Sequence, residues 1–401
     1  MKYLWPLAVL FLSNFLTAQE SENPLFSSFE NYKKAKENTP FQVKWISAGP
    51  VTNSARVEAL QGDPNQPGTM YVAFGSGNLW KTTNNGLDWK PIFENQPTLG
   101  IGDIAIAPSN SEILYLGTGE SLRKNRNFTM PGTGVYRSDD GGETWTHLGL
   151  EETWHIGEIA VHPHNPDIVF VAAMGKFWSE STSKGIYRTI NGGKDWERVL
   201  YVNENTRAND IVIAHSNPKI IYASMWENND NTNIAESVYG PNSGIYYSSD
   251  GGSSWKKSKN GLPDEPKIGR IGLAVSYQNA QKVYALMDNR NETEGNSAEV
   301  YQSMNGGVTW KRSHNDTLRI FPGNNIGWYF ADIYVNPKND DEIYSLGVRM
   351  AHSKDGGKTF STVGGNIQHL QPSPAQTLHL DHCELWINPF NPNHLALGND
   401  G

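Results

Sequence analysis

Three carboxylic acids stand at positions that have no counterpart elsewhere in the chain: Glu120, Asp381 and Asp400. Hydrolysis of a glycosidic bond needs two carboxyl groups beside the bond, about 5–5.5 Å apart for retention of configuration and about 6.5–9.5 Å for inversion. These acids are therefore the candidate catalytic residues, and we expect Asp381, between His379 and His382, to be one working acid or base. A structural role stays open, because acids that pair with arginines also gather in clefts.

Aromatic, cationic and amide side chains of the same exceptional kind accompany these acids, and Trp154 and Arg207 are two of them. Sugars stack on aromatic rings and form hydrogen bonds with charged groups, so this combination favours a carbohydrate or a peptide as ligand. The predicted ligand-binding residues are Arg126, Trp178, Trp226, Arg270, Trp328, Tyr329, His379, His382 and Asn399.

Residues His379, Asp381 and His382 also combine the imidazole and carboxylate groups that suit zinc or a similar ion. Neighbouring side chains of a strand point to opposite sides, so all three reach one ion only if the loop curls. We therefore predict neither a metal nor any other cofactor.

A repeated octet positions these residues. Its pattern is Ser or Thr, any residue, Asp or Asn, any residue, Gly, any two residues, and an aromatic residue. Asp or Asn followed by Gly accepts the positive φ of a hairpin turn, which predicts a turn between two strands at each octet. The octet occurs six times, at intervals of 50–59 residues, and closes at Trp89, Trp145, Trp196, Trp255, Trp310 and Phe360.

Two strand-like segments precede each octet, for example 103–108 and 113–117. With the strands that enter and leave the octet, each unit has four short strands, which is typical of a β-propeller blade. A seventh unit begins at 384, and residues 45–49 resemble the strand that leaves an octet. The sequence therefore predicts an all-β, seven-bladed β-propeller of four-stranded blades over residues 41–401. The N-terminal strand would close blade seven, whose C-terminal part is missing.

The repeats also separate scaffold from site, because a residue type that recurs at one position of every unit is expected to hold the unit together. This comparison assigns a structural role to the octet residues. It assigns the same role to five acids that precede the apolar strand of their unit: Asp103, Glu158, Asp210, Asp332 and Glu384.

The first 40 residues lie outside the repeats. Lys2, an apolar run from Tyr3 to Leu16 and a small residue at Ala18 form the layout of a secretory signal peptide, and the run is short for a membrane span. We expect residues 1–18 to be removed, 19–40 to be a lead-in segment, and the protein to be secreted, periplasmic or at the cell surface of a bacterium. No later segment is apolar enough to span a membrane.

Charge and cysteine content exclude two further classes. The formal net charge is −9 and the chain has no basic block, so nucleic acid is not an expected partner. The single cysteine, Cys383, has no partner for an intrachain disulfide, which excludes a small disulfide-stapled fold.

The octets resemble Asp-box (BNR) repeats, and the wider phrases 116–120, 155–158, 222–226, 269–272, 328–330 and 398–401 occur in the same order as in one family. The chain resembles the secreted bacterial sortilin-like, or glycosyl hydrolase BNR repeat, propellers, which are distantly similar to xyloglucan hydrolases and sialidases. The resemblance implies a propeller that binds carbohydrate polymers and, in full-length form, hydrolyses glycosidic bonds. The alternative is a non-catalytic, sortilin-like propeller that binds peptides or partner proteins.

Members of that family are usually longer, so we expect further domains beyond Gly401. Xyloglucan hydrolases carry a catalytic aspartate in the loop before the first octet. This chain has Phe74-Gly75-Ser76-Gly77 at that place, which favours the binding alternative.

Overall fold

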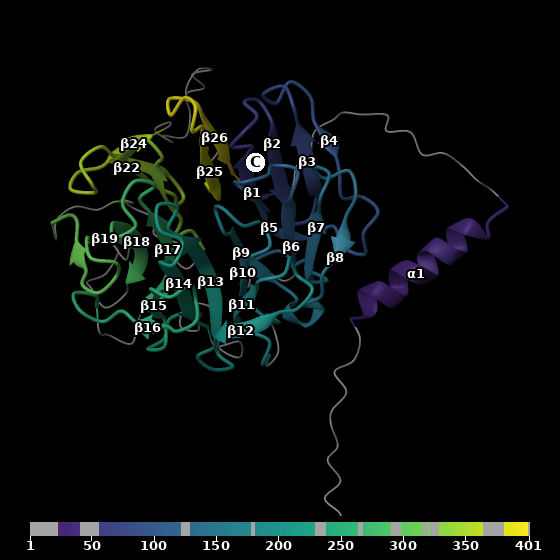
Figure 1. Cartoon of the computed structure of the whole chain (residues 1–401), viewed down its shortest axis with the longest axis horizontal. Coiled ribbons are helices and arrows are strands. Elements are labelled where there is room, and N and C mark those ends of the chain that lie inside the picture. Colours follow the sequence, from purple (N-terminus) through teal and green to yellow (C-terminus); the bar gives the residue numbers. More distant parts are fainter. Residues whose placement is uncertain are drawn as a thin grey trace, which may run out of the picture.

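Antiparallel sheets of four strands surround a common centre in the computed structural model of the protein (Figure 1). The structure describes residues 23–40, 56–121, 129–177, 181–228, 238–263, 268–289, 298–315, 320, 329–363 and 381–399. Within these ranges six four-stranded blades are present rather than seven. The predicted all-β propeller with four-stranded blades is confirmed, and the predicted strand at 45–49 lies outside the described residues.

Each blade runs in chain order from its innermost strand to its outermost one. Blades one to three consist of β1 (Val57–Gly62), β2 (Met70–Phe74), β3 (Asn78–Thr82) and β4 (Lys90–Pro91); β5 (Ile101–Ile106), β6 (Leu114–Thr118), β7 (Val135–Ser138) and β8 (Thr146–His147); and β9 (Ile156–Val161), β10 (Val169–Ala173), β11 (Gly185–Thr189) and β12 (Glu197–Leu200). A short 3₁₀ helix, Glu151–Thr153, joins blades two and three.

Blades four to six repeat the arrangement. They consist of β13 (Thr206–Ile213), β14 (Ile221–Glu227), β15 (Gly244–Ser248) and β16 (Lys256–Lys257); β17 (Ile268–Val275), β18 (Val283–Asn289), β19 (Ala298–Ser303) and β20 (Lys311–Arg312); and β21 (Ile333–Asn336), β22 (Asn339–Ser345), β23 (Met350–Ser353) and β24 (Ser361–Val363).

A two-stranded sheet, β25 (Glu384–Ile387) and β26 (Leu395–Gly398), lies between blade six and blade one (Figure 1). Leu385 packs in one apolar cluster with Tyr344 of blade six, and Trp386 packs in another with Leu60 of blade one. Gly62 makes room for the indole of Trp386, because a Cβ atom there would lie 2.1 Å from the ring.

The hydrophobic core is divided among the gaps between blades. The cluster between blades two and three, for example, joins Tyr115 and Val135 to Ile156 and Val171. Similar clusters fill the next gaps along the ring. The apolar side chains of the strands therefore serve contacts between neighbouring sheets, as expected where the faces of sheets pack together.

The octets form the turns between the third and fourth strands, and Ser138 illustrates the bonds. Its hydroxyl accepts the N–H of Gly142 at 2.8 Å and donates to Asp140 at 2.7 Å, while Asp140 accepts the N–H of Thr144 at 2.8 Å. A bond from the Thr144 side chain lowers the pKa of Asp140 to about 2. The Gly bond to the first Ser or Thr recurs in the other five octets.

Helix α1 (Pro24–Glu37) stands apart from the ring (Figure 1). Asn23 caps it by accepting the N–H of Leu25, and its amide donates to the carbonyl of Gly132 in the propeller. Phe26 packs edge-on against His147 at 5.0 Å. We had assigned no element to this lead-in segment. Within the described residues no helix is long and apolar enough to cross a membrane.

Replacement of Asp140 by Ala tests the octet turn. The variant loses the bonds to Thr144 and Ser138, so we expect Tm at neutral pH to fall by about 2–3 °C. Because the pKa of Asp140 is lowered on folding, this contribution is present above about pH 4 and disappears as pH falls through about 2. Glu143→Ala, which removes only an exposed pair with Lys90, is the matched control. Equal Tm values for the two variants in thermal unfolding would contradict the assignment.

Candidate functional site

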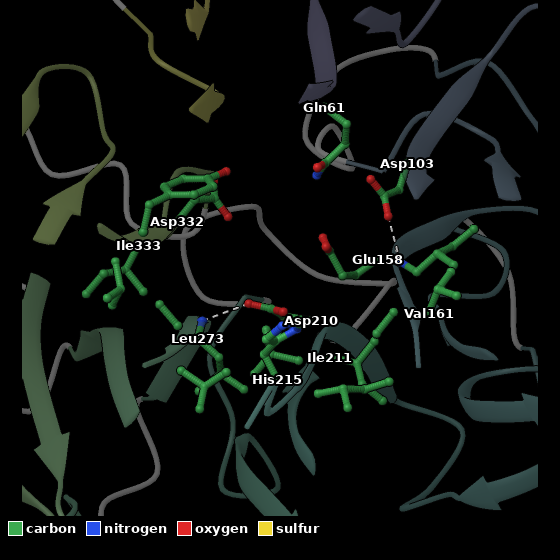
Figure 2. A pocket seen from close by; sticks show the side chains of 18 of the residues that line it. Gln61, Asp103, Glu158, Val161, Asp210, Ile211, His215, Leu273, Asp332 and Ile333 are labelled. Carbon is green, nitrogen blue, oxygen red and sulfur yellow. Dashed lines mark hydrogen bonds between the residues drawn. The ribbon is translucent and has the colours of Figure 1, made fainter. Parts of the chain in front are cut away.

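A cavity of about 330 Å³ lies at the centre of the ring, where the inner strands meet (Figure 2). Its lining is mixed in polarity, and the apolar part includes Ile159, Ile211 and Leu273. His215 and Tyr277, which follow the inner strands of blades four and five, also line it. Figure 2 shows carboxyl groups from several blades directed into the same space: Asp103, Glu158, Asp210 and Asp332.

These carboxyl groups, with Glu384, are the five recurring acids of the sequence. Three of them lie within the inner strands β5, β9 and β13, Asp332 directly precedes β21, and Glu384 is the first residue of β25. The strand registers place Ala59 and Gly272 at the corresponding positions of β1 and β17. The repeat that identified the acids as structural therefore also gathers them around one cavity, which we had not predicted.

Two of the acids join neighbouring blades. Asp103 accepts the backbone N–H of Ile159 at 2.6 Å, and Asp210 accepts that of Leu273 at 2.7 Å. Each bond runs from the inner strand of one blade to the inner strand of the next. A structural role is therefore observed for these two carboxylates.

Among the described residues, one guanidinium contacts the acid ring. Arg270 of β17 donates to Asp332 at 3.0 Å, to the Asn209 side chain at 2.9 Å and to the carbonyl of Tyr329. Glu384 in turn accepts the hydroxyl of Tyr334 at 2.9 Å. Arg270, which we predicted as a ligand-binding residue, is therefore held by groups of the protein itself.

Burial sets the protonation of the ring. It raises the pKa values of Asp103 and Asp210 to about 7, although backbone N–H bonds act in the opposite direction. Burial, reinforced by the other acids, raises the pKa values of Glu158 and Glu384 well above their usual range. Burial also raises the pKa of Asp332, against the effect of Arg270. At neutral pH the cavity therefore holds protons, and carboxyl groups of this kind can both donate and accept them.

Within the described ranges, no three or more His, Cys, Asp or Glu residues are arranged so as to hold a metal ion. His379, one of the three residues that suggested a metal, lies outside the described residues.

Glu120 follows β6 and is 3% exposed. Its carboxylate accepts the N–H of Met130 at 3.2 Å and lies 3.6 Å from the Arg56 guanidinium. Gly75 separates it from a second buried acid, Glu58, since a Cβ atom on Gly75 would lie 2.9 Å from Glu120 and 3.1 Å from Glu58. We missed Glu58, although its place one residue before the recurring acid position marks it as an exception.

A buried stack fixes the backbone of Glu120. The His155 ring lies parallel to Phe177 with centroids 4.1 Å apart, and the Arg207 guanidinium lies 4.7 Å from the Phe177 centroid. Burial and Arg207 lower the pKa of His155 to about 3, so the ring is neutral and its Nδ1–H donates to the Glu120 carbonyl at 2.9 Å. Arg207 also donates to the carbonyls of Met174 and Lys176.

Other predicted ligand-binding residues also have internal partners. Trp226 is buried and its indole N–H donates to the carbonyl of Val238, and the backbone carbonyl of Asn399 accepts the N–H of Val57. Tyr329 packs with Cys383, which places it near His382 and Asp381. Arg270, Tyr329 and the 381–383 segment are therefore brought together. Five predicted residues lie outside the described ranges: Arg126, Trp178, Trp328, His379 and Asp400.

The backbone at the 381–383 segment is anchored to blade six. Asp381 has a positive φ of 64°, and its N–H donates to the carbonyl of Val348, while the N–H of His382 donates to that of Gly347. His382 is buried and Asp381 is half-buried. A non-glycine residue in this conformation needs support from its surroundings, which the two bonds supply.

Comparisons with known proteins agree with this fold. Residues 133–295 match the family model described as Sortilin, neurotensin receptor 3. The xyloglucanase Xgh74A of Acetivibrio thermocellus is 24% identical over 357 residues, which cover 72% of this chain and 39% of the enzyme. The chain thus spans about two fifths of that relative.

Two solved structures share the fold. A GH74 xyloglucanase from Xanthomonas campestris superposes with a TM-score of 0.62 at 17% identity, covering 89% of this chain and 52% of that one. YCF48 bound to D1 peptide superposes with a TM-score of 0.54 at 13% identity, covering 90% and 96%. The predicted resemblance to sortilin-like and xyloglucanase-like propellers is confirmed.

Arg270→Met tests the link between the cation and the acid ring. Removal of the guanidinium leaves the buried oxygens of Asp332, Asn209 and Tyr329 without their donor, so we expect a loss of about 3 kcal/mol in unfolding free energy. The double variant Arg270→Met/Asp332→Asn should recover part of this loss, because the carboxylate is then gone. The measurement is urea unfolding of the two single variants and the double variant. If the double variant loses the sum of the unfolding free energies that the single variants lose, the two side chains do not interact.

Proposed function

We propose that this chain is a secreted propeller that binds a carbohydrate polymer, with xyloglucan as the first candidate. The observation that carries the proposal is the similarity to a xyloglucanase over 72% of the chain. The negative charge and the absence of a basic block in the sequence are compatible with a neutral polysaccharide.

Hydrolysis belongs to the proposal only for a longer form of the protein. The pair Glu58 and Glu120 flanks Gly75, in the loop where the resemblance implies a catalytic aspartate. Both acids are nearly buried and Glu120 lies beside Arg56, so this pair is a structural feature of the loop rather than an open acid–base pair. We propose Asp381 and Asp400 as the acids that act in the full-length protein.

We further propose that β25 and β26 are the inner half of a seventh blade. Trp386 packs this sheet against blade one, in the way that apolar clusters pack the other blades against their neighbours. Residues 45–49 would supply the outermost strand of the seventh blade. Residues 1–18 would direct the chain out of the cytoplasm, to the periplasm, the cell surface or the medium.

A peptide ligand is the second candidate. It is favoured by the sortilin match over residues 133–295 and by a propeller of the same fold that is bound to a peptide. A peptide would bind to the same loops as a carbohydrate, so the two candidate functions differ in the ligand and not in the position of the site.

Binding to immobilised xyloglucan, cellulose and a random peptide library separates these functions. We expect retention on xyloglucan, and about tenfold weaker binding for Trp178→Ala or Trp328→Ala, because one lost stacking contact is worth about 1.4 kcal/mol. Tyr201→Ala, at a half-exposed tyrosine beside the outer strand of blade three, is the control. Retention on peptides alone would refute the carbohydrate proposal in favour of the sortilin-like one.

Release of reducing sugar in the same assay tests catalysis. Where release is found in a full-length protein, we expect Asp381→Asn to lower its rate by a factor of about a hundred or more while polymer binding is unchanged. Full activity in this variant would exclude Asp381 as the working acid or base.

A further inference from the structure

The central cavity contains far more acidic than basic groups. Its described lining includes five carboxyl groups and no Lys or Arg, and the one guanidinium that reaches the ring belongs to Arg270, which bonds Asp332. The other titratable groups at the cavity are His215, Tyr277 and Tyr334. Five ionised carboxylates that line one cavity, with no Lys or Arg among its described lining residues, would repel one another.

The same groups are placed where the blades have to be held together. Asp103 and Asp210 each bond the backbone of the next inner strand, Asp332 bonds Arg270 of the preceding blade, and Glu384 bonds Tyr334 of blade six. The ring of carboxyl groups therefore spans four blades and the β25–β26 sheet, and any repulsion within it acts between these sheets.

We propose that the five carboxyl groups form a proton-dependent clasp, which holds the inner strands together while it is protonated and forces them apart when it ionises. The clasp is independent of the proposed carbohydrate function, because it concerns the stability of the ring and not the loops that would contact a ligand.

The sign of the pH effect follows from the pKa values. The folded ring keeps protons that the unfolded chain releases above about pH 4, so its contribution to stability is complete below that pH. It falls as pH rises towards and beyond 7, where Asp103 and Asp210 ionise. The octet aspartates act in the opposite direction, but only below about pH 4, so stability should be highest in mildly acidic solution.

Thermal unfolding of the whole chain between about pH 5 and pH 8 tests the clasp. We expect Tm of the wild-type protein to fall by about 5 °C or more over this range. The double variant Asp103→Asn/Asp210→Asn keeps an acceptor oxygen at both interblade bonds, and we expect its Tm to fall less and to exceed that of the wild type at about pH 8. Glu143→Gln, at an exposed carboxylate, should leave the wild-type slope unchanged.

Proton release on unfolding gives a test that needs no variant. In weakly buffered urea at about pH 6, unfolding should release protons in net, since the acids of the ring lose theirs and outnumber the one buried histidine, His155, that gains a proton. A wild-type Tm that is constant or rises with pH, or a net uptake of protons, would overturn the proposal. A further outcome would also overturn it: if millimolar calcium chloride at about pH 8 restored the acidic Tm of the wild type but not of the double variant, the ring would be a cation site.

Discussion

The strand ladders of this propeller stay within the blades, so side chains, close packing and a few backbone bonds between loops and strand ends must join one blade to the next. This constraint explains why the inner strands of neighbouring blades pack so closely against each other. Gly272 has no side chain because a Cβ atom there would lie 1.8 Å from the carbonyl of Ala331. A Cβ atom on Gly102 would likewise lie 2.0 Å from the carbonyl oxygen of Ile156. Close backbone contact brings the carboxyl groups of successive inner strands within reach of their neighbours.

The close packing of neighbouring blades also explains which partners the polar side chains bind. Arg270 and Trp226 looked available for a ligand in the sequence, because nothing like them recurs in the other blades. In the structure both satisfy groups of adjacent segments, Asp332 and the carbonyl of Tyr329 in one case and that of Val238 in the other. A polar residue that occurs in only one unit of a repeat protein has a role specific to that unit. Contact with the neighbouring unit is such a role as readily as ligand binding is.

The repeating part of the fold could be predicted from the sequence. The Asp or Asn and Gly residues of the octet indicate a turn, and the spacing of the octets leaves room for four strands in each unit. It was insufficient for features that depend on distances between units. The meeting of Asp103, Glu158 and Asp210 in one cavity follows from ring geometry, and the pair Glu58 and Glu120 from the width of the gap at Gly75. Helix α1 carried local signals in Asn23 and Pro24. The helix has no buried residue, so the sequence contains no apolar face from which it could have been predicted.

The seam between Gly62 and Trp386 has a consequence for how such rings change over time. The indole occupies a slot that exists only because position 62 has no side chain, so the first and last described sheets meet in one rotational alignment. Loss or duplication of an internal unit would move Trp386 relative to that slot. Any descendant with a different number of units must therefore rebuild this one contact before its ring can close.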